Sequence, residues 1–388
     1  MKPIYCKELK IMDLKELRNR IDTLDDELLK LFLQRMELCS QVAEVKAQIK
    51  KPVADAGRER EILSRVTRSS PEELGGYARE LYSTLFRLSR SYQSSKMPRS
   101  GSISEFIAGL EKDLEFPKTV RAACQGIEGA YSQQACDKVF SFADITFFRS
   151  FEGVFNAVEK GLCDYGVLPI ENSSHGIVRD VYDLMRSHSF YIVRSTSLQI
   201  KHDLLALPGA ELSGIREIVS HEQAIGQCAK LIASMPGVRI TLCENTAVAA
   251  KLVAESGRSD IAAISSPVCA DMYGLRPLKS GVQDSDNNRT RFIVISKKAE
   301  IYPGANRISI LFSTPNKAGA LSGVLSRLAD IGVNLTRLES RPVAGTDFEY
   351  VFYADLDASV RSPELLSLLD ELSDELRTFV FLGSYSEI

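Results

Sequence analysis

The residues near the start of the chain with the clearest chemical potential are cations set in an apolar helical pattern. Leucine, isoleucine and valine recur at alternating spacings of three and four from Leu14 to Ile49, which predicts one face of a long helix. Arg35 falls on that face, and Lys46 follows eleven residues later on nearly the same side, about 16 Å along the axis. A cation so placed needs a counter-charge or a ligand. The pattern therefore indicates either a small-anion site or a polar residue that sets helix register.

Arg18 stands apart from this pair. It lies seventeen residues before Arg35, about 25 Å along the same helix, too far for the two to share a small ligand within one chain. The predicted helix runs for about 50 Å before Pro52 ends it, which is too long to bury its apolar face inside a small domain. We therefore expect a homodimer or a higher homo-oligomer, in which Arg18 serves the site of a partner chain.

Two shorter helices are expected near 57–67 and 72–95, and they carry further polar groups. These are Asp55, Arg58, Glu59, Ser89 and Gln93. Ser89 and Gln93 are four residues apart and share one helix face. Capping, a solvated face or a helix-to-helix pair explains each residue taken alone.

In the middle of the chain, polar side chains cluster where predicted strands end. The clusters are Glu171-Asn172-Ser173-Ser174, Ser220-His221-Glu222-Gln223 and Asn245-Thr246-Ala247. Helix capping explains any one of them, whereas three at strand ends favour a ligand cleft. Strands and helices alternate throughout 119–298, which predicts an α/β domain of two lobes with mainly parallel sheets.

The last segment, 305–388, has strands and helices in the order βαββαβ, which predicts a ferredoxin-like α+β fold. Gly319-Ala320-Leu321 opens its first helix, and the next strand carries Asn334-Leu335 and Glu339-Ser340-Arg341. A helix start with small residues and an edge strand ended by proline would explain both motifs structurally.

Composition excludes several classes of protein. The net charge of −3 gives no bulk electrostatic support for a nucleic-acid partner. No apolar run approaches the roughly 20 residues of a membrane span, and the first ten residues lack the apolar core of a signal peptide. Eight scattered cysteines without a C-x-x-C pair favour reduced thiols in the cytoplasm, and the presence of only four histidines argues against a histidine-rich metal centre. No cofactor is implied.

The helical segment as a whole resembles the all-helical class of chorismate mutase, through LRNRID, LLKLFLQRMEL, VKAQIKKPVADAGREREIL and SYQ. The resemblance implies rearrangement of chorismate to prephenate, a unimolecular reaction that requires a compact substrate and stabilised charge on the ether oxygen. Arg18, Arg35 and Arg58 would then bind carboxylates, and Lys46 and Gln93 the ether oxygen. Ser89, Asp55 and Glu59 would complete the site, the two acids serving the substrate hydroxyl and the cations.

The central segment resembles the prephenate dehydratases, through PIENSSHGIVRDVYDL, SHEQAIGQC, NTAVAA, YGL and NNRTRFIVIS in that order. By this resemblance Thr290 is the leading catalytic residue, and Glu171, Asn172, Ser173, Gln227 and Thr246 shape the pocket. Arg291 would serve a substrate carboxylate or point away on its strand. A hydroxyl donor suits the departure of hydroxide with carbon dioxide. The wording GIEGAYSQQA departs from the family at Ala130, where a hydroxyl is more usual.

The C-terminal segment resembles the ACT domain of the same dehydratases, in which phenylalanine binds at a subunit interface. The resemblance implies effector contacts from Gly319, Ala320, Leu321, Asn334, Leu335, Glu339, Ser340 and Arg341.

The complete expectation is a bifunctional enzyme of phenylalanine biosynthesis that phenylalanine inhibits. Its parts are a mutase domain at 1–95, a linker at 96–118, a dehydratase domain at 119–298 and a regulatory domain at 305–388. The residues favour neither prephenate nor arogenate as the substrate of the dehydratase.

Three alternatives remain. The first is a monofunctional dehydratase that a helical segment dimerises. The second is an amino-acid-responsive binding protein without catalysis. The third is a hydrolase built on Ser220 and His221, which lacks the G-x-S-x-G elbow.

Overall fold

A computed structural model describes residues 13–49, 51, 53, 55–96, 102–111, 114–342 and 350–388. Its contacts divide the chain into two compact units. The first contains the N-terminal helices with residues 319–332 and 363–372, and the second contains residues 105–318, 333–362 and 373–388. Each unit is described by itself.

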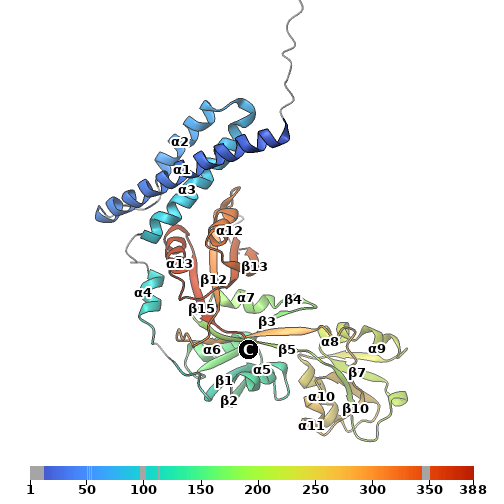
Figure 1. Cartoon of the computed structure of the whole chain (residues 1–388). Coiled ribbons are helices and arrows are strands. Elements are labelled where there is room, and N and C mark those ends of the chain that lie inside the picture. The colour runs from blue at the N-terminus through green and yellow to red at the C-terminus, as the bar shows by residue number, and fades with distance from the viewer. Residues whose placement is uncertain are drawn as a thin grey trace, which may run out of the picture. The chain divides into compact units, whose positions relative to one another are not determined.

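The first unit is helical. α1 (Leu14–Gln48), α2 (Ala56–Ser69) and α3 (Gly75–Lys96) form its N-terminal part, with a 3-10 turn, η1, at Glu72–Leu74. Both α1 and α2 pack along α3, and Figure 1 shows α1 as the longest of the three. Asp13 and Asp55 cap α1 and α2 by accepting hydrogen bonds from backbone N–H groups of the first turn. The helical prediction for this segment is confirmed, although Pro52 itself lies outside the described residues.

The apolar face of α1 is largely uncovered within one chain. Ala43 is the buried residue of this helix, whereas Leu24, Leu31 and Leu38 are 63%, 63% and 60% exposed. The remaining exposed apolar residues of the face are Leu14, Leu17, Ile21, Leu28, Val42, Val45 and Ile49. A continuous apolar stripe of this length on one helix is typical of a protein interface.

The second unit begins with a lobe built on one mixed sheet, in the order β2-β1-β3-β11-β5, with β4 paired to β3. Its strands are β1 (Thr119–Gln125), β2 (Phe142–Phe148), β3 (Tyr165–Asn172), β4 (Gly176–Ile177), β5 (Tyr191–Gln199) and β11 (Arg289–Ser296). Its helices are α5 (Tyr131–Val139), α6 (Phe151–Glu159) and α7 (Arg179–Met185). The chain leaves this lobe after β5 and returns to it in β11, as Figure 1 shows.

The second lobe lies between these two strands in sequence and has a five-stranded sheet, in the order β10-β6-β9-β7-β8. Its strands are β6 (Asp203–Ala206), β7 (Glu217–Ser220), β8 (Arg239–Leu242), β9 (Ile261–Ser265) and β10 (Arg276–Lys279). Its helices are η2 (Leu212–Gly214), α8 (Glu222–Gln227), α9 (Ala229–Ala233), α10 (Thr246–Ser256) and α11 (Val268–Tyr273).

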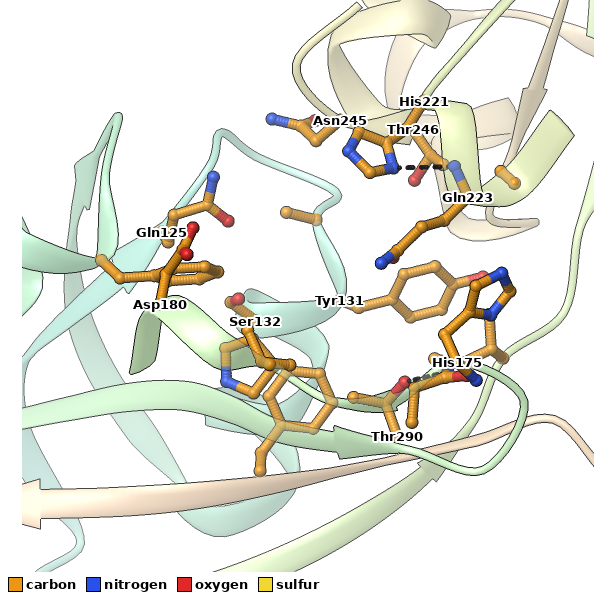
Figure 2. Close-up of a pocket in the computed structure, with 18 of the residues that line it drawn as sticks. Gln125, Tyr131, Ser132, His175, Asp180, His221, Gln223, Asn245, Thr246 and Thr290 are labelled. Carbon is orange, nitrogen blue, oxygen red and sulfur yellow. Dashed lines mark hydrogen bonds between the residues drawn. The ribbon is translucent and has the colours of Figure 1, made fainter. Parts of the chain in front are cut away.

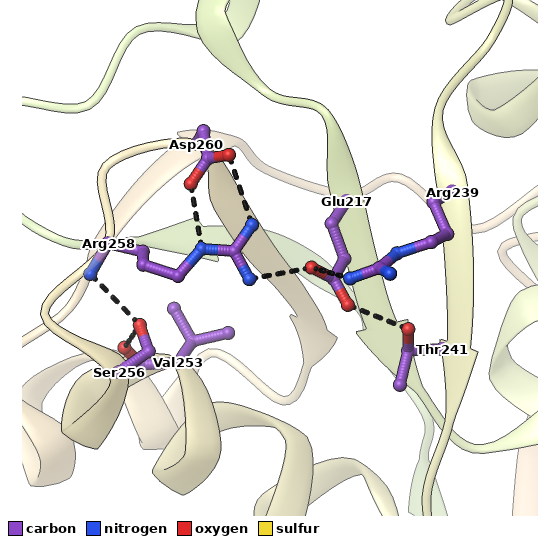
Figure 3. A network of polar contacts seen from close by, with 7 residues as sticks. All are labelled: Glu217, Arg239, Thr241, Val253, Ser256, Arg258 and Asp260. Carbon is purple, nitrogen blue, oxygen red and sulfur yellow. Dashed lines mark hydrogen bonds and ion pairs between the residues drawn. The ribbon is translucent and has the colours of Figure 1, made fainter.

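A buried carboxylate joins the strands of the second lobe. Glu217 on β7 accepts from Arg239, from Thr241 and from Arg258, and Arg258 also pairs with Asp260 (Figure 3). The hydrogen bonds from Arg239 and Thr241 lower the pKa of Glu217 to about 2. The network therefore ties β7 to β8 and to the loop before β9.

Both sheets contain more antiparallel pairing than the sequence predicts. β1, β2 and β3 are parallel, but β11 runs antiparallel to β3 and to β5. β7, β8 and β9 are parallel, but β6 runs antiparallel to β9 and to β10. The prediction of mainly parallel sheets is wrong because it lacked β5, β6 and β10, and because β11 enters the first sheet between β3 and β5, antiparallel to both. The predicted linker also holds a short helix, α4 (Ser102–Ala108).

The C-terminal segment has the predicted order βαββαβ. The elements are β12 (Arg307–Thr314), α12 (Ala320–Asp330), β13 (Asn334–Pro342), β14 (Tyr350–Asp357), α13 (Pro363–Glu375) and β15 (Phe379–Tyr385). The four strands form an antiparallel sheet in the order β13-β14-β12-β15. Tyr353 and Tyr385 of this sheet share a hydrophobic core with Tyr182 and Leu168 of the first lobe. The sheet and the first lobe therefore fold around one continuous core.

Candidate active sites

In the helical unit, Arg35 points from α1 onto α3. Its guanidinium donates to the hydroxyl of Ser89 and to the carbonyl of Leu85 (3.4 Å), and it lies 5.8 Å from the centre of the Phe86 ring. Ser89 is 4% exposed. Arg35 and Ser89, both predicted for the mutase site, are thus brought together by the packing of the two helices.

Gln93, one turn after Ser89 on α3, is 7% exposed, and its Oε1 has no hydrogen-bond partner among the described residues. A buried amide oxygen without a partner loses the hydrogen bonds that water would give it. Lys46 donates to the carbonyl of Val53, and Glu59 of α2 pairs with Arg90 of α3. Ser89, Gln93 and Glu59 therefore all lie at the contacts of α3 with its neighbours.

Three other predicted mutase residues lie at the surface. Asp55 caps α2 by accepting from the backbone N–H of Arg58 (3.0 Å). The Arg58 guanidinium is 55% exposed and pairs with Glu61, one turn away on the same helix. Arg18 is exposed near the start of α1. Within one chain these residues are not gathered around Arg35.

In the second unit, a cavity of about 510 Å³ opens between the two lobes. Figure 2 shows polar side chains from both lobes pointing into it. Asn172 and Thr290 line it from the first lobe, and Gln227 and Thr246 from the second. Four of the seven residues predicted for the dehydratase site therefore meet at one cavity.

Thr290 is held at the cavity by strand pairing. It lies on β11 opposite Asn172 on β3, and it is 8% exposed. The Nδ2 group of Asn172 donates to Oγ1 of Thr290 over 2.9 Å. Because this bond uses a lone pair of the oxygen, the hydroxyl proton of Thr290 remains available as a donor.

The second lobe presents the start of α10 to the same cavity. Asn245 caps this helix by accepting from the N–H of Val248 (2.9 Å), and Thr246 is its first residue. The free N–H groups and the dipole of a helix start favour a negatively charged group. This end of the cavity therefore suits a substrate carboxylate.

Histidines form part of the wall, and the sequence analysis gave them no role in the dehydratase site. His175, His202 and His221 all line the cavity. Burial lowers the pKa of His202 and of His221, so both rings are neutral at neutral pH. His221 belongs to a strand-end cluster visible in the sequence, whereas nothing in sequence alone brings His175 and His202 together.

Other polar lining residues were also missed. They are Gln125, Tyr131, Ser132, Asp180, Gln223 and Asn245. Gln223 and Asn245 belong to the clusters at strand ends, so that signal could have identified them. Of the others, Gln125 ends β1, and Tyr131, Ser132 and Asp180 lie in the first turns of α5 and α7. Residues of these types are common on any surface.

Three residues predicted for the dehydratase pocket are absent from its lining. Glu171 and Arg291 each neighbour a cavity residue on a strand, so their side chains take the opposite face of the sheet. Ser173 instead bonds the carbonyl of Asn287 and the N–H of Arg289, and so closes the turn beside the cavity. The expectation that Glu171 and Ser173 shape the pocket directly is not met by this geometry. For Arg291 the geometry agrees with the second of the two alternatives, that its side chain points away.

On that opposite face, charged residues meet the C-terminal sheet. Arg291 donates to Asp355 on β14, and Arg337 on β13 pairs with Glu171. Burial would lower the pKa of Arg291, but the attraction of Asp355 outweighs it and the pKa is raised. The strands that carry Asn172 and Thr290 are thus both bonded to the C-terminal sheet.

The predicted effector residues divide between the two units. Gly319 caps α12 in the left-handed conformation (φ 81°), followed by Ala320 and Leu321. Asn334, Leu335, Glu339, Ser340 and Arg341 lie on β13. Arg341 makes a bidentate contact with Asp183 of α7, with its Nη2 2.8 Å from each carboxylate oxygen.

The geometry contradicts the hydrolase alternative. Ser220 is fully buried, and its hydroxyl donates to the carbonyl of Ile264 over 2.7 Å. Nδ1 of His221 accepts from the N–H of Gln223. The serine therefore has neither exposure nor a histidine base.

Within the described ranges, no group of three or more histidine, cysteine, aspartate or glutamate side chains is arranged to hold a metal ion. No helix in the described part of the chain is long and apolar enough to cross a membrane.

The chain thus has two candidate active sites: a helical one with a cation, a hydroxyl and an amide, and a two-lobed α/β cleft with a buried threonine hydroxyl. Family models match both parts: chorismate mutase type II over residues 17–94 and prephenate dehydratase over residues 122–300. The bifunctional chorismate mutase/prephenate dehydratase of Escherichia coli (strain K12) is 33% identical over 378 residues, which cover 95% of each chain. The chain belongs to this family of bifunctional enzymes. It carries an isomerase and a lyase activity of phenylalanine biosynthesis.

Two solved structures resemble a large part of the chain. Prephenate dehydratase from Arthrobacter aurescens, in complex with L-Phe, has a TM-score of 0.64 and 29% identity, and covers 69% of this chain and 90% of that one. GqqA, described as a novel type of quorum quenching acylase, has a TM-score of 0.63 and 33% identity, and covers 69% of this chain and 98% of that one.

Proposed function

We propose that the two activities are carried by separate sets of residues: Arg35, Lys46, Ser89 and Gln93 in the helical unit, and Thr290 with Asn172, Gln227 and Thr246 in the cleft. The observation that carries the assignment of the second site is the hydrogen bond from Asn172 to Thr290 (2.9 Å). It leaves the proton of a buried hydroxyl directed to a ligand in the cavity.

The mutase site acts by holding the substrate in one conformation and by stabilising charge electrostatically. Chorismate rearranges without a nucleophile, so the protein has to hold the reactive conformer and stabilise the negative charge that develops on the ether oxygen. Arg35 binds a carboxylate of the substrate. Gln93 has a buried amide with an unpartnered oxygen, and rotation of that amide presents its N–H group to the ether oxygen together with Lys46.

In the dehydratase site, the ring hydroxyl of prephenate lies at Thr290 and a carboxylate lies at the start of α10. The carbon–oxygen bond breaks while the ring carboxylate leaves as carbon dioxide, and the electron pair of that carbon–carbon bond completes the aromatic ring. The departing oxygen takes the proton of Thr290 and leaves as water, and solvent in the cavity restores the proton. The product is phenylpyruvate.

The mutase is active as a homodimer in this proposal. The exposed apolar stripe of α1 supports a partner helix, because a stripe of ten apolar residues is unfavourable in water. Arg18 is exposed on the same helix and completes the site of the partner chain. Arg58 and Glu59 supply the remaining charges, and Asp55 orients Arg58 through the cap of α2.

The C-terminal segment is an ACT-type regulatory domain that binds phenylalanine and inhibits the dehydratase. The βαββαβ order supports this assignment, as does the related dehydratase that was solved with L-Phe. The effector is held by Gly319, Ala320, Leu321, Asn334, Leu335, Glu339 and Ser340. Arg341 acts through Asp183 and α7, which leads to the cavity residues Arg179 and Asp180.

Free thiols at all seven described cysteines support a cytoplasmic location, because disulfides are rare there.

The test of the dehydratase assignment is a pair of substitutions at one position. Thr290→Val keeps the shape of the side chain and removes the hydroxyl, and we expect kcat for prephenate to fall at least about a hundredfold. Thr290→Ser keeps the hydroxyl and is expected to retain most of the activity. A Thr290→Val variant with near-normal kcat would show that the threonine is structural.

A separate experiment tests regulation. Calorimetric titration of the full chain with phenylalanine is expected to show saturable binding that Leu335→Asp removes, while uninhibited dehydratase turnover persists. Unchanged phenylalanine affinity in the Leu335→Asp variant would place the effector elsewhere.

A further inference from the structure

Three polar side chains from distant parts of the sequence form one hydrogen-bonded chain along the wall of the dehydratase cavity. Nε2 of His202 lies 2.9 Å from Oε1 of Gln227, and Nε2 of Gln227 lies 3.1 Å from Nδ1 of His175. His202 precedes β6, Gln227 ends α8, and His175 lies in the turn between β3 and β4. The chain therefore links the second lobe to the turn that follows Asn172 in the first.

The buried end of the chain fixes where the protons lie. His202 is 2% exposed, and its Nδ1 has no partner among the described residues. A proton on Nδ1 would be a buried donor without an acceptor, which proteins avoid more strictly than an unused lone pair. The proton of the neutral ring is therefore on Nε2, and it is donated to Oε1 of Gln227.

The tautomer of His202 determines the orientation of the Gln227 amide, and that amide in turn determines the tautomer of His175. With Oε1 facing His202, the Nε2 group of Gln227 donates to Nδ1 of His175. Because Nδ1 of His175 accepts this hydrogen bond, the ring carries its proton on Nε2, the nitrogen that Gln227 does not occupy. His175 is exposed and lines the cavity, so this N–H can reach a ligand there.

The turn that carries His175 is anchored by the same amide that binds the proposed catalytic hydroxyl. Oδ1 of Asn172 accepts from the N–H groups of Ser174 (2.9 Å) and His175 (3.1 Å), while its Nδ2 donates to Thr290. In Figure 2, His175 and Thr290 lie in the same part of the cavity, away from Gln125 and Asp180. The side chain of Asn172 thus fixes the position of the Thr290 hydroxyl relative to the turn that carries His175.

We infer that His175 is a second hydrogen-bond donor to the departing hydroxyl of prephenate, with Gln227 and His202 as the positioning residues that set its tautomer. This inference rests on the proposed role of Thr290. As the carbon–oxygen bond breaks, the oxygen gains negative charge, takes its proton from Thr290 and accepts a hydrogen bond from Nε2–H of His175. A donor to that oxygen is worth most in the transition state, so its loss lowers kcat more than it raises KM.

The experiment compares two substitutions at position 175. His175→Phe removes the donor and keeps a ring, and we expect kcat for prephenate to fall about ten- to a hundredfold with KM within about threefold. His175→Gln places an amide N–H near the position of Nε2 and is expected to recover most of that loss. The chorismate mutase rate of the same preparations reports on folding. His188→Gln is the matched histidine control, because His188 pairs with Glu159 outside the cavity, and it should leave kcat unchanged.

The outcomes separate the inferred role of His175 from the proposed role of Thr290. Wild-type kcat in His175→Phe, with Thr290→Val inactive, would overturn the role of His175 and leave Thr290 in place. Equal losses in His175→Phe and His175→Gln would make the ring structural and would also overturn it. An active Thr290→Val variant would instead overturn the proposed site on which the inference rests.

Discussion

Arg291, the residue after Thr290 on β11, donates a hydrogen bond to the carboxylate of Asp355 on β14. The side chains of both residues are largely buried, at 14% and 8% exposure. The other carboxylate oxygen of Asp355 accepts from Ser309 (2.5 Å). The C-terminal sheet is thereby bonded to the strand that carries the proposed catalytic hydroxyl.

We expect this ion pair to behave as a unit. Asp355→Leu leaves the Arg291 guanidinium buried without its counter-charge, which is expected to cost about 3–5 kcal/mol of stability. Arg291→Met combined with Asp355→Leu removes both charges and should be less destabilising than the sum of the single substitutions. Thermal unfolding of the four proteins gives the coupling energy. Strictly additive losses would mean that the two residues do not interact in solution.

A second prediction concerns Arg341, which the sequence analysis assigned to the effector and which contacts Asp183 in the structure. If Arg341 transmits the effect of phenylalanine through Asp183, then Arg341→Ala and Asp183→Ala should weaken inhibition of the dehydratase to a similar extent. A coupling between two sites can be lost without loss of binding at either one. Calorimetry should therefore find phenylalanine affinity changed by less than about fivefold in both variants. If only Arg341→Ala lost affinity for phenylalanine, Arg341 would instead be a residue that contacts the effector.

Glu217 should make the second lobe sensitive to acid. Its pKa is lowered to about 2 in the folded chain, from an ordinary value near 4.5, by Arg239 first and then by Thr241. The depressed pKa stabilises the fold above pH 4.5, and this contribution is lost as the pH falls from about 4.5 towards 2. We predict that Glu217→Gln lowers the urea midpoint at pH 6 and that its difference from the unmodified protein narrows by pH 3.

The matched control for this titration is Glu255→Gln, because Glu255 forms an exposed pair with Lys251 at 3.9 Å. Such pairs contribute little to stability. We expect no pH-dependent difference for it. If the difference in urea midpoint between Glu217→Gln and the unmodified protein stayed constant between pH 6 and pH 3, the proposed role of the Glu217 charge would be contradicted.

Subunit sharing can be tested by mixing inactive variants. Arg18 and Arg35 lie about 25 Å apart along α1, so the proposed dimer has each site taking Arg18 from one chain and Arg35 from the other. Arg18→Ala and Arg35→Ala chains should each lack mutase activity, and exchange of subunits between them should restore part of it. The heterodimer then contains one site with both arginines intact. No recovery after exchange has been verified by mass would count against an intertwined dimer.

Much of the secondary structure could be predicted because the signals are local. The heptad pattern predicts α1, and the apolar runs predict β1, β3, β11 and the four strands of the C-terminal sheet. β5, with the sequence YIVRSTSLQ, was missed because half of it is polar. Its polar residues Ser195 and Thr196 are buried by contact with the last residues of the chain. Burial by such a distant segment does not produce a hydrophobic periodicity in the sequence of the strand.

The candidate sites could be predicted in part, and the difference follows from strand geometry. Residue type and resemblance identified Thr290, Asn172, Gln227 and Thr246, which meet at the cavity. Glu171 was assigned to the same pocket although alternation along a strand places it on the opposite face from Asn172, whereas for Arg291 the same alternation left both orientations open. His175 and His202 could not be found, since their relation depends on Gln227 and on the approach of the two lobes.

The central claim is that one chain performs two reactions at two separable sites, and product analysis with each substrate tests it most directly. Unmodified protein, Arg35→Ala and Thr290→Val would each receive chorismate and, separately, prephenate, with prephenate and phenylpyruvate measured. We predict that Thr290→Val accumulates prephenate from chorismate, and that Arg35→Ala leaves chorismate unchanged yet converts prephenate to phenylpyruvate at the normal rate. Loss of both reactions in either variant, with its fold intact, would indicate one shared site and contradict the account.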